Sequence, residues 1–88
     1  MIAQSVTVVN ALGLHARAAA RFVHRAGQFR SRIRVARDSQ TVDGKSILGL
    51  LLLAAARGTV LDLSIDGDDE AQAMAALVDL AARGFEDP

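Results

Sequence analysis

Four short stretches of this sequence alternate apolar with polar residues, and this pattern constrains the fold more than any other feature. In the first stretch, Val6 and Val8 share one face and Thr7 lies on the other. Alternation of this kind predicts a strand that buries one of its two faces. Asp38 and Ser39 form a tight turn between two such stretches, which predicts a hairpin. The predicted strands cover residues 2–9, 32–37, 40–43 and 60–66.

Three other stretches carry apolar residues at helical spacing. The first, residues 16–26, ends at Gly27, and the second, residues 47–56, has Ser46 as a good N-cap. Asp69 with Gln72 resembles a capping box at the start of the third. The predicted buried stripe of this third helix is Ala73, Met74, Leu77, Leu80 and Ala81. Four strands with segregated helices predict an α+β domain of two layers, with the helices on one face of the sheet.

Length and composition limit the class of protein. With 88 residues, the chain is expected to form a single domain, residues 1–88, around one core. Ten basic residues balance ten acidic ones, which argues against a nucleic-acid binder that relies on bulk charge. The sequence has no cysteine, which excludes disulfides, thiol catalysis and thiolate metal sites. His15 and His24 lack nearby paired carboxylates, so we expect no metal site.

The sequence shows no segment for export or membrane insertion. Residues 1–9 lack the basic start and apolar middle of a signal peptide, so we expect a cytoplasmic location. The longest apolar run, residues 47–56, is too short to span a bilayer and is interrupted by Gly49. We therefore expect neither a membrane nor nucleic acid among the partners.

One turn places chemically useful residues at the start of a predicted helix. Gly13 and Leu14 precede His15, and an arginine, Arg17, follows two positions later. A helix N-terminus carries unpaired N–H groups and partial positive charge, so it can hold a phosphoryl group without a metal. His15 would supply the attacking nitrogen, and the planar guanidinium of Arg17 would bind phosphoryl oxygens. The alternative that these residues leave open is a capping or solvent-facing histidine beside an ordinary first-turn arginine.

Two separate segments carry a resemblance to a known family. Residues 13–17, GLHAR, resemble the phosphorylation loop of the histidine-containing phosphocarrier proteins, HPr, of the phosphoenolpyruvate-dependent phosphotransferase system. Residues 45–50, KSILGL, are similar to the signature of the second helix in that family, and the order and separation of the two segments match as well. The resemblance implies an open-faced β-sandwich, in which a four-stranded antiparallel sheet carries three helices on one face in the order βαββαβα.

The resemblance also implies a role for the first segment. His15 would accept a phosphoryl group on Nδ1 from phosphorylated Enzyme I, itself charged by phosphoenolpyruvate, and pass it to EIIA-type acceptors. Ala16, Arg17 and Ala18 would bind the phosphoryl oxygens. Such a protein is a stoichiometric carrier, not an enzyme, and needs no cofactor. The family usually has proline where this chain has Ala18, so we expect altered site geometry or partner preference and a changed phosphorylation rate.

Ser46 has two interpretations. As an N-cap, its hydroxyl satisfies helix N–H groups and needs no further function. In some members of the family, the matching serine is phosphorylated as a regulatory switch by an ATP-dependent kinase, the HPr kinase/phosphorylase. Added negative charge there would suit the helix terminus but alter the surface that faces partners.

Partner contacts are predicted on two helices. In the second helix, Leu50 and Leu53 are expected to be buried against the sheet. Of the other apolar side chains, three would form a docking surface for Enzyme I and acceptors near the active histidine, namely Ile47, Leu48 and Leu51. In the first helix, Arg17, Arg21 and His24 share one face and are expected to frame this surface with positive charge.

Several functional alternatives stay open at this point. One branch of the family feeds sugar-specific permease components, whereas the other, NPr, belongs to a nitrogen-related regulatory phosphorelay, which residues 49–55 and 84–87 somewhat resemble. An interaction module that acts only through phosphorylation of Ser46 is an alternative of a different class, and the presence of His15 with Arg17 favours the carrier. No nucleotide loop or nucleophile triad indicates a kinase or hydrolase. We expect a monomer, because a carrier presents one site to successive partners.

Overall fold

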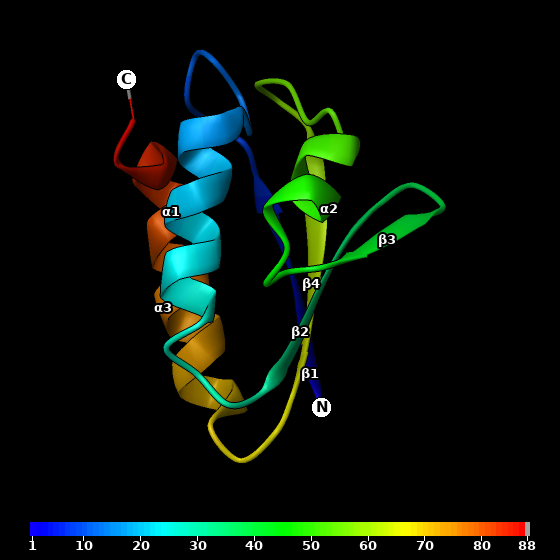
Figure 1. Cartoon of the computed structure of the whole chain (residues 1–88), viewed down its shortest axis with the longest axis vertical. Coiled ribbons are helices and arrows are strands. Elements are labelled where there is room, and N and C mark those ends of the chain that lie inside the picture. The colour runs from blue at the N-terminus through cyan, green and yellow to red at the C-terminus, as the bar shows by residue number, and fades with distance from the viewer. Residues whose placement is uncertain (88) are drawn as a thin grey trace.

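The computed structural model describes residues 1–87, and its strands and α-helices follow one another in the order that the sequence patterns predict (Figure 1). The strands are β1 (Ile2–Thr7), β2 (Arg32–Arg37), β3 (Gln40–Asp43) and β4 (Val60–Asp66). The helices are α1 (Ala16–Ala26), α2 (Ile47–Leu52), α3 (Glu70–Ala82) and a single 3-10 turn, η1 (Gly84–Glu86). No helix in this described part of the chain is long and apolar enough to cross a membrane.

Element boundaries differ from the predictions at three places. The helix α2 ends at Leu52, not at residue 56, because Ala54 takes a left-handed backbone with φ of 49°. The strand β1 ends at Thr7, not at residue 9, since Thr7 already pairs with Val60, the first residue of β4. The sequence patterns did not predict η1, the turn that follows α3.

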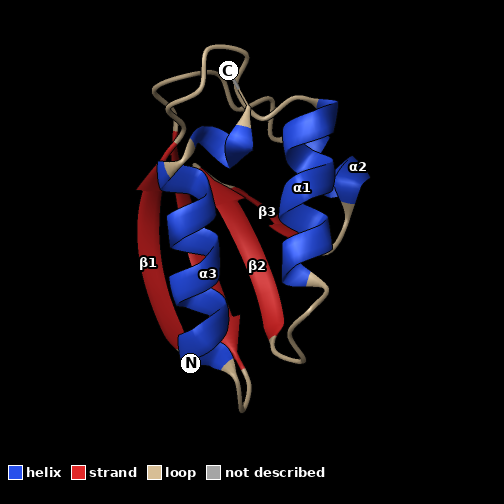
Figure 2. Cartoon of the chain, turned by 90° about the vertical axis from the view of Figure 1, so that its left-hand side faces the viewer, coloured by secondary structure: helices blue, strands red, loops and turns tan. Residues whose placement is uncertain are grey.

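The four strands form one antiparallel sheet in the order β1-β4-β2-β3. The register sets Val6 opposite Leu61 and Ile33 opposite Ile65, so inward-facing side chains of neighbouring strands lie side by side. All three α-helices lie on one face of the sheet (Figure 2). The predicted open-faced α+β sandwich is therefore confirmed.

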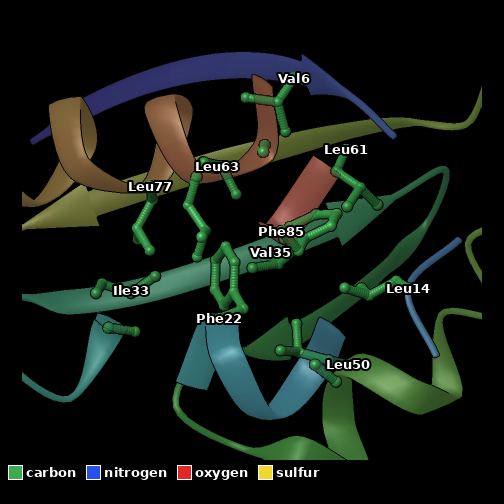
Figure 3. Packing of buried hydrophobic residues seen from close by; sticks show 14 of the residues in the cluster. Val6, Leu14, Phe22, Ile33, Val35, Leu50, Leu61, Leu63, Leu77 and Phe85 are labelled. Atoms are coloured by element: carbon green, nitrogen blue, oxygen red, sulfur yellow. The ribbon is translucent and has the colours of Figure 1, made fainter. Parts of the chain in front are cut away.

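The core fills the space between this face and the helices (Figure 3). Phe22 of α1, Leu50 of α2 and Leu77 of α3 are at most 2% exposed and pack in one cluster with Val35 and Leu63 of the sheet. Removing each such side chain from water contributes about 1.5–3 kcal/mol, so packing against the sheet stabilises all three helices. The other side chains predicted to be buried are buried: Leu53, Ala73, Met74, Leu80 and Ala81.

The capping box predicted for α3 is wrong. Asp69 is the N-cap residue, but its side chain makes no capping hydrogen bond. Its carboxylate instead accepts from the backbone N–H groups of Arg30 at 2.8 Å and Ser31 at 3.0 Å, and from the Ser31 hydroxyl at 2.5 Å. These bonds, that of the Ser31 hydroxyl first, lower the pKa of Asp69 to about 2. Asp69 thus ties the loop before β2 to the start of α3.

Candidate functional site

The turn before α1 is built so that His15 becomes the N-cap of that helix. Asn10 Nδ2 donates to Gly13 O at 2.8 Å, and the Leu14 N–H donates to Ala55 O at 2.9 Å. Gly13 has a φ of +70°, and a Cβ at this position would lie 2.5 Å from Ala55 O. Only glycine therefore fits both the backbone conformation and the space. The buried Leu14 anchors the turn in the core and leaves His15 at its end.

His15 presents one ring nitrogen to the start of α1 and the other to the C-terminal tail. The backbone N–H of Arg17 donates to His15 Nδ1 at 3.3 Å. On the opposite side of the ring, Nε2 lies 2.5 Å from Asp87 Oδ2. Among the described residues, no hydrogen bond uses the backbone N–H of Ala16 or Ala18. Nδ1 therefore lies at the N-terminus of α1, where the helix attracts anions. The first turn of α1 has no acidic side chain that would repel them.

Arg17 lies beside His15 and is held by the same carboxylate. Its Nε and a terminal guanidinium nitrogen each lie 2.7 Å from Asp87 Oδ1. The side chain of Asp87 is fully buried, whereas that of Arg17 is 57% exposed. Hydrogen bonding to His15, and then to Arg17, holds the pKa of Asp87 below its usual value despite the opposing effect of burial. His15, Arg17 and Asp87 therefore form one connected cluster of charged and polar groups.

Asp87 is a site residue that the sequence analysis missed. It lies 72 positions from His15, and no local pattern marks it. The tail reaches α1 through Phe85, which is 1% exposed and packs edge to face on Phe22 with ring centroids 6.5 Å apart (Figure 3). Arg21 also holds the tail, since its guanidinium donates to Phe85 O at 3.1 Å. The sequence signal that could have indicated this contact is an aromatic residue, Phe85, near the end of the chain.

The predicted docking residues of α2 are arranged as a partly exposed apolar surface. Leu48 is 75% exposed and Ile47 40%, while Leu51 is half-buried against the core. Leu51 also lines a shallow hollow of about 330 Å³ to which Leu12 and His15 contribute. The apolar surface of α2 therefore reaches the histidine, as predicted.

The positive residues of α1 do not frame this apolar surface, and that part of the prediction is wrong. Arg17, Arg21 and His24 share a face, but this face turns toward α3. There they line a groove of about 530 Å³ together with Leu80 and Arg83. Their direction follows from the tail, because Asp87 and the carbonyl groups before it bind the two arginines. His15 thus lies between an apolar surface on one side and a basic groove on the other.

Ser46 is the N-cap of α2, as predicted. Its Oγ accepts from the backbone N–H of Gly49 at 3.0 Å, and its side chain is partly buried. Within residues 1–87, no group of three His, Cys, Asp or Glu side chains could hold a metal ion.

Comparisons with known proteins agree with this arrangement. The family model for the PTS HPr component phosphorylation site matches residues 2–83. Phosphocarrier protein HPr of Neisseria meningitidis is 54% identical over 80 residues, which cover 91% of this chain and 90% of that protein. The crystal structure of HPr-C-His from Thermoanaerobacter tengcongensis superposes with a TM-score of 0.95 at 43% identity and covers 100% of this chain and 99% of that chain. A crystal structure described as an HPr dimer from the same organism has a TM-score of 0.77 at 45% identity, covering 97% and 98% of the two chains.

The fold, with a histidine at the N-terminus of α1, defines a small phosphocarrier protein. The chain belongs to the HPr family of the phosphotransferase system.

Proposed function

We propose that His15 accepts a phosphoryl group on Nδ1 from phosphorylated Enzyme I and passes it to an EIIA-type acceptor. The observation that carries this proposal is the position of Nδ1 at the start of α1, beside the backbone N–H groups of Ala16 and Ala18, which no hydrogen bond within residues 1–87 uses. The protein would act as a stoichiometric carrier in the cytoplasm and work as a monomer. Sugar uptake is the branch that we propose, and the nitrogen-related relay is the alternative.

The chemistry suits a carrier that has no metal. Phosphoryl transfer passes through a loose transition state, so positioning and electrostatic stabilisation are most of what the protein contributes. The N–H groups of Ala16 and Ala18 would donate to phosphoryl oxygens, and Arg17 would supply a permanent positive charge. Ala18 adds an N–H that the usual proline of the family lacks, so this chain would bind the phosphoryl group with one more donor.

Partner docking would use both sides of His15. Ile47, Leu48 and Leu51 would pack against an apolar surface of Enzyme I and of the acceptor. On the other side of His15, Arg21 and His24 would attract acidic residues of these partners to the groove between α1 and α3. With a docking surface on each side of His15, successive partners would be able to reach the same histidine.

The test is transfer of labelled phosphate from phosphoenolpyruvate through purified Enzyme I. We expect the wild type to gain acid-labile, base-stable label, His15→Ala to gain none, and Arg17→Ala to gain it more slowly. Arg34→Ala is the matched control, because Arg34 is an exposed arginine of β2 outside the site. Failure of the wild type with both sugar-type and nitrogen-type Enzyme I would refute the proposal. Success with only one type identifies the branch.

Regulation at Ser46 is a separate proposal. Its hydroxyl already accepts a helix N–H, so a phosphate attached there would lie at the start of α2, where no acidic side chain occupies the first turn. Incubation with HPr kinase/phosphorylase and ATP tests this, with Ser46→Ala as control. If only the wild type incorporates label, Ser46 is the modified residue.

A further inference from the structure

Asp87 contacts both residues of the proposed phosphorylation site. We propose that it is a positioning residue: its carboxylate holds the His15 proton on Nε2 and thereby keeps Nδ1 as the attacking nitrogen. This role rests on the proposed carrier function of His15. It assigns a task to a residue that lies outside residues 2–83, the part matched by the family model.

Two hydrogen bonds select the same form of the imidazole. An ionised carboxylate can only accept, so the contact of 2.5 Å between His15 Nε2 and Asp87 Oδ2 requires the hydrogen to be on Nε2. The Arg17 N–H donates to Nδ1 at 3.3 Å, which requires a lone pair there. A neutral imidazole has one nitrogen of each kind, and its partners decide which one carries the proton. Both contacts therefore favour the tautomer in which Nδ1 is the nucleophile.

The carboxylate is itself held in a fixed orientation. Oδ1 of Asp87 accepts from Arg17, which leaves Oδ2 for His15, and the side chain is fully buried. Phe85 and Glu86, just before it, have φ of 56° and 58°, a conformation unfavourable for residues with side chains. Such a backbone persists only where its surroundings hold it, and here Phe85 is buried against Phe22. The strained turn is what delivers Asp87 to the ring.

The transfer step needs no proton movement in this arrangement. The Nδ1 lone pair forms the bond to phosphorus, the bond from phosphorus to the donor's leaving group breaks, and that electron pair stays with the donor. The proton remains on Nε2. Positive charge then develops on the ring, and the adjacent Asp87 carboxylate stabilises it, as a buried carboxylate does for a catalytic histidine.

The two oxygens of Asp87 make Asp87→Asn an informative substitution. Arg17 can only donate, so the amide oxygen of the variant would face Arg17 and its NH2 group would face His15 Nε2. That NH2 group donates, which stabilises the tautomer with hydrogen on Nδ1 and occupies the nucleophile. Asp87→Ala removes the acceptor without adding a donor, so it should not reverse the tautomer. Asp79→Asn is the matched control, because Asp79 is an exposed carboxylate that also pairs with an arginine, at 3.0 Å.

The experiment measures the tautomer and the transfer rate in the full chain. Nitrogen-15 NMR of unphosphorylated protein, at a pH where the imidazole is neutral, reports which nitrogen carries hydrogen, and Enzyme I with labelled phosphoenolpyruvate gives the rate. We expect hydrogen on Nε2 in the wild type and in Asp79→Asn, and a shift toward Nδ1 in Asp87→Asn. The rate should fall by about tenfold or more in Asp87→Asn, less in Asp87→Ala, and not at all in Asp79→Asn.

The outcomes separate this role from a structural one. A rate loss in Asp87→Asn without a tautomer shift means that Asp87 only holds the tail, which overturns the proposal, and so does a shift that leaves the rate unchanged. Hydrogen on Nδ1 in the wild type overturns it as well. If the wild type accepts no phosphate at all, the carrier function fails, whereas the NMR comparison still decides whether Asp87 sets the position of the proton.

Discussion

Gly13 is the position where the site depends most directly on the absence of a side chain. Its φ is +70°, and an added Cβ would lie 2.5 Å from Ala55 O, the oxygen that accepts from the Leu14 N–H. A residue with a side chain costs about 1–2 kcal/mol in this left-handed region. Displacing a buried carbonyl from its donor costs about 1–3 kcal/mol more. We therefore expect Gly13→Ala to lower the free energy of unfolding by about 2–5 kcal/mol.

Gly58 provides a matched control for the backbone cost alone. Its φ is +92°, but apart from its two chain neighbours no residue of the described chain lies within 4 Å of an added Cβ. Gly58→Ala should therefore lose only the conformational part, about 1–2 kcal/mol. Urea unfolding followed by circular dichroism measures both variants, and equal m values would show that the denatured states are comparable.

The difference between the two variants is the quantity that tests the reasoning. If close approach to Ala55 O matters, Gly13→Ala loses about 1–3 kcal/mol more than Gly58→Ala. It also slows phosphorylation by Enzyme I under conditions where both variants are folded, because the displaced Leu14 moves the adjacent His15. Equal losses of stability, or equal phosphorylation rates, would refute the account of how this turn positions the histidine.

Four further predictions follow from particular contacts. Ser46→Ala removes the N-cap of α2 and should lower the free energy of unfolding by about 0.5–2 kcal/mol in urea titration; no change would contradict the capping role. Leu50→Ala should lose about 2–5 kcal/mol in the same assay, whereas Leu48→Ala should change stability by no more than about 0.5 kcal/mol but weaken binding to Enzyme I in calorimetry. Ala18→Pro should keep the fold, with stability within about 1 kcal/mol of wild type, because no hydrogen bond within residues 1–87 uses that N–H; a larger loss in a thermal melt would show that the N–H has a structural role. The folded-state pKa of Asp69 is about 2, below its usual 3.8, so its contribution to stability is complete above pH 3.8 and is lost as the pH falls toward 2. Urea titrations at pH 5 and pH 2 should show a smaller acid-induced loss for Asp69→Asn than for wild type, and equal losses would contradict the assignment.

Much of the fold could be predicted because its signals are local. Alternation in Arg32–Arg37 and Val60–Asp66, and the apolar stripe of Glu70–Ala82, each depend on residues within one element. The period of the pattern identifies strand or helix, and the element order implies two layers. His15 and Ser46 were also accessible, since a cap is defined by the few residues that follow it.

The errors arose where a long-range contact competes with a local pattern. Asp69 has the spacing of a capping box, but Ser31 and Arg30 bind its carboxylate from a distant loop. The apolar run of α2 continues to residue 56, but the left-handed backbone at Ala54 ends the helix and lets the chain return past Gly13. In both cases, tertiary contacts stabilise a conformation that the local sequence does not favour.

The order of strands and α-helices, the family resemblance and the histidine at the start of a helix can all be predicted from neighbouring residues, because periodicity and short motifs are local features. The folded chain is needed to see which nitrogen of His15 faces the helix terminus and that Asp87, 72 positions away, binds the other one. The same is true of Arg21, which turns toward the tail and not toward α2. Side-chain direction and the pairing of charges depend on how the finished layers pack, and packing brings together groups that no local pattern connects.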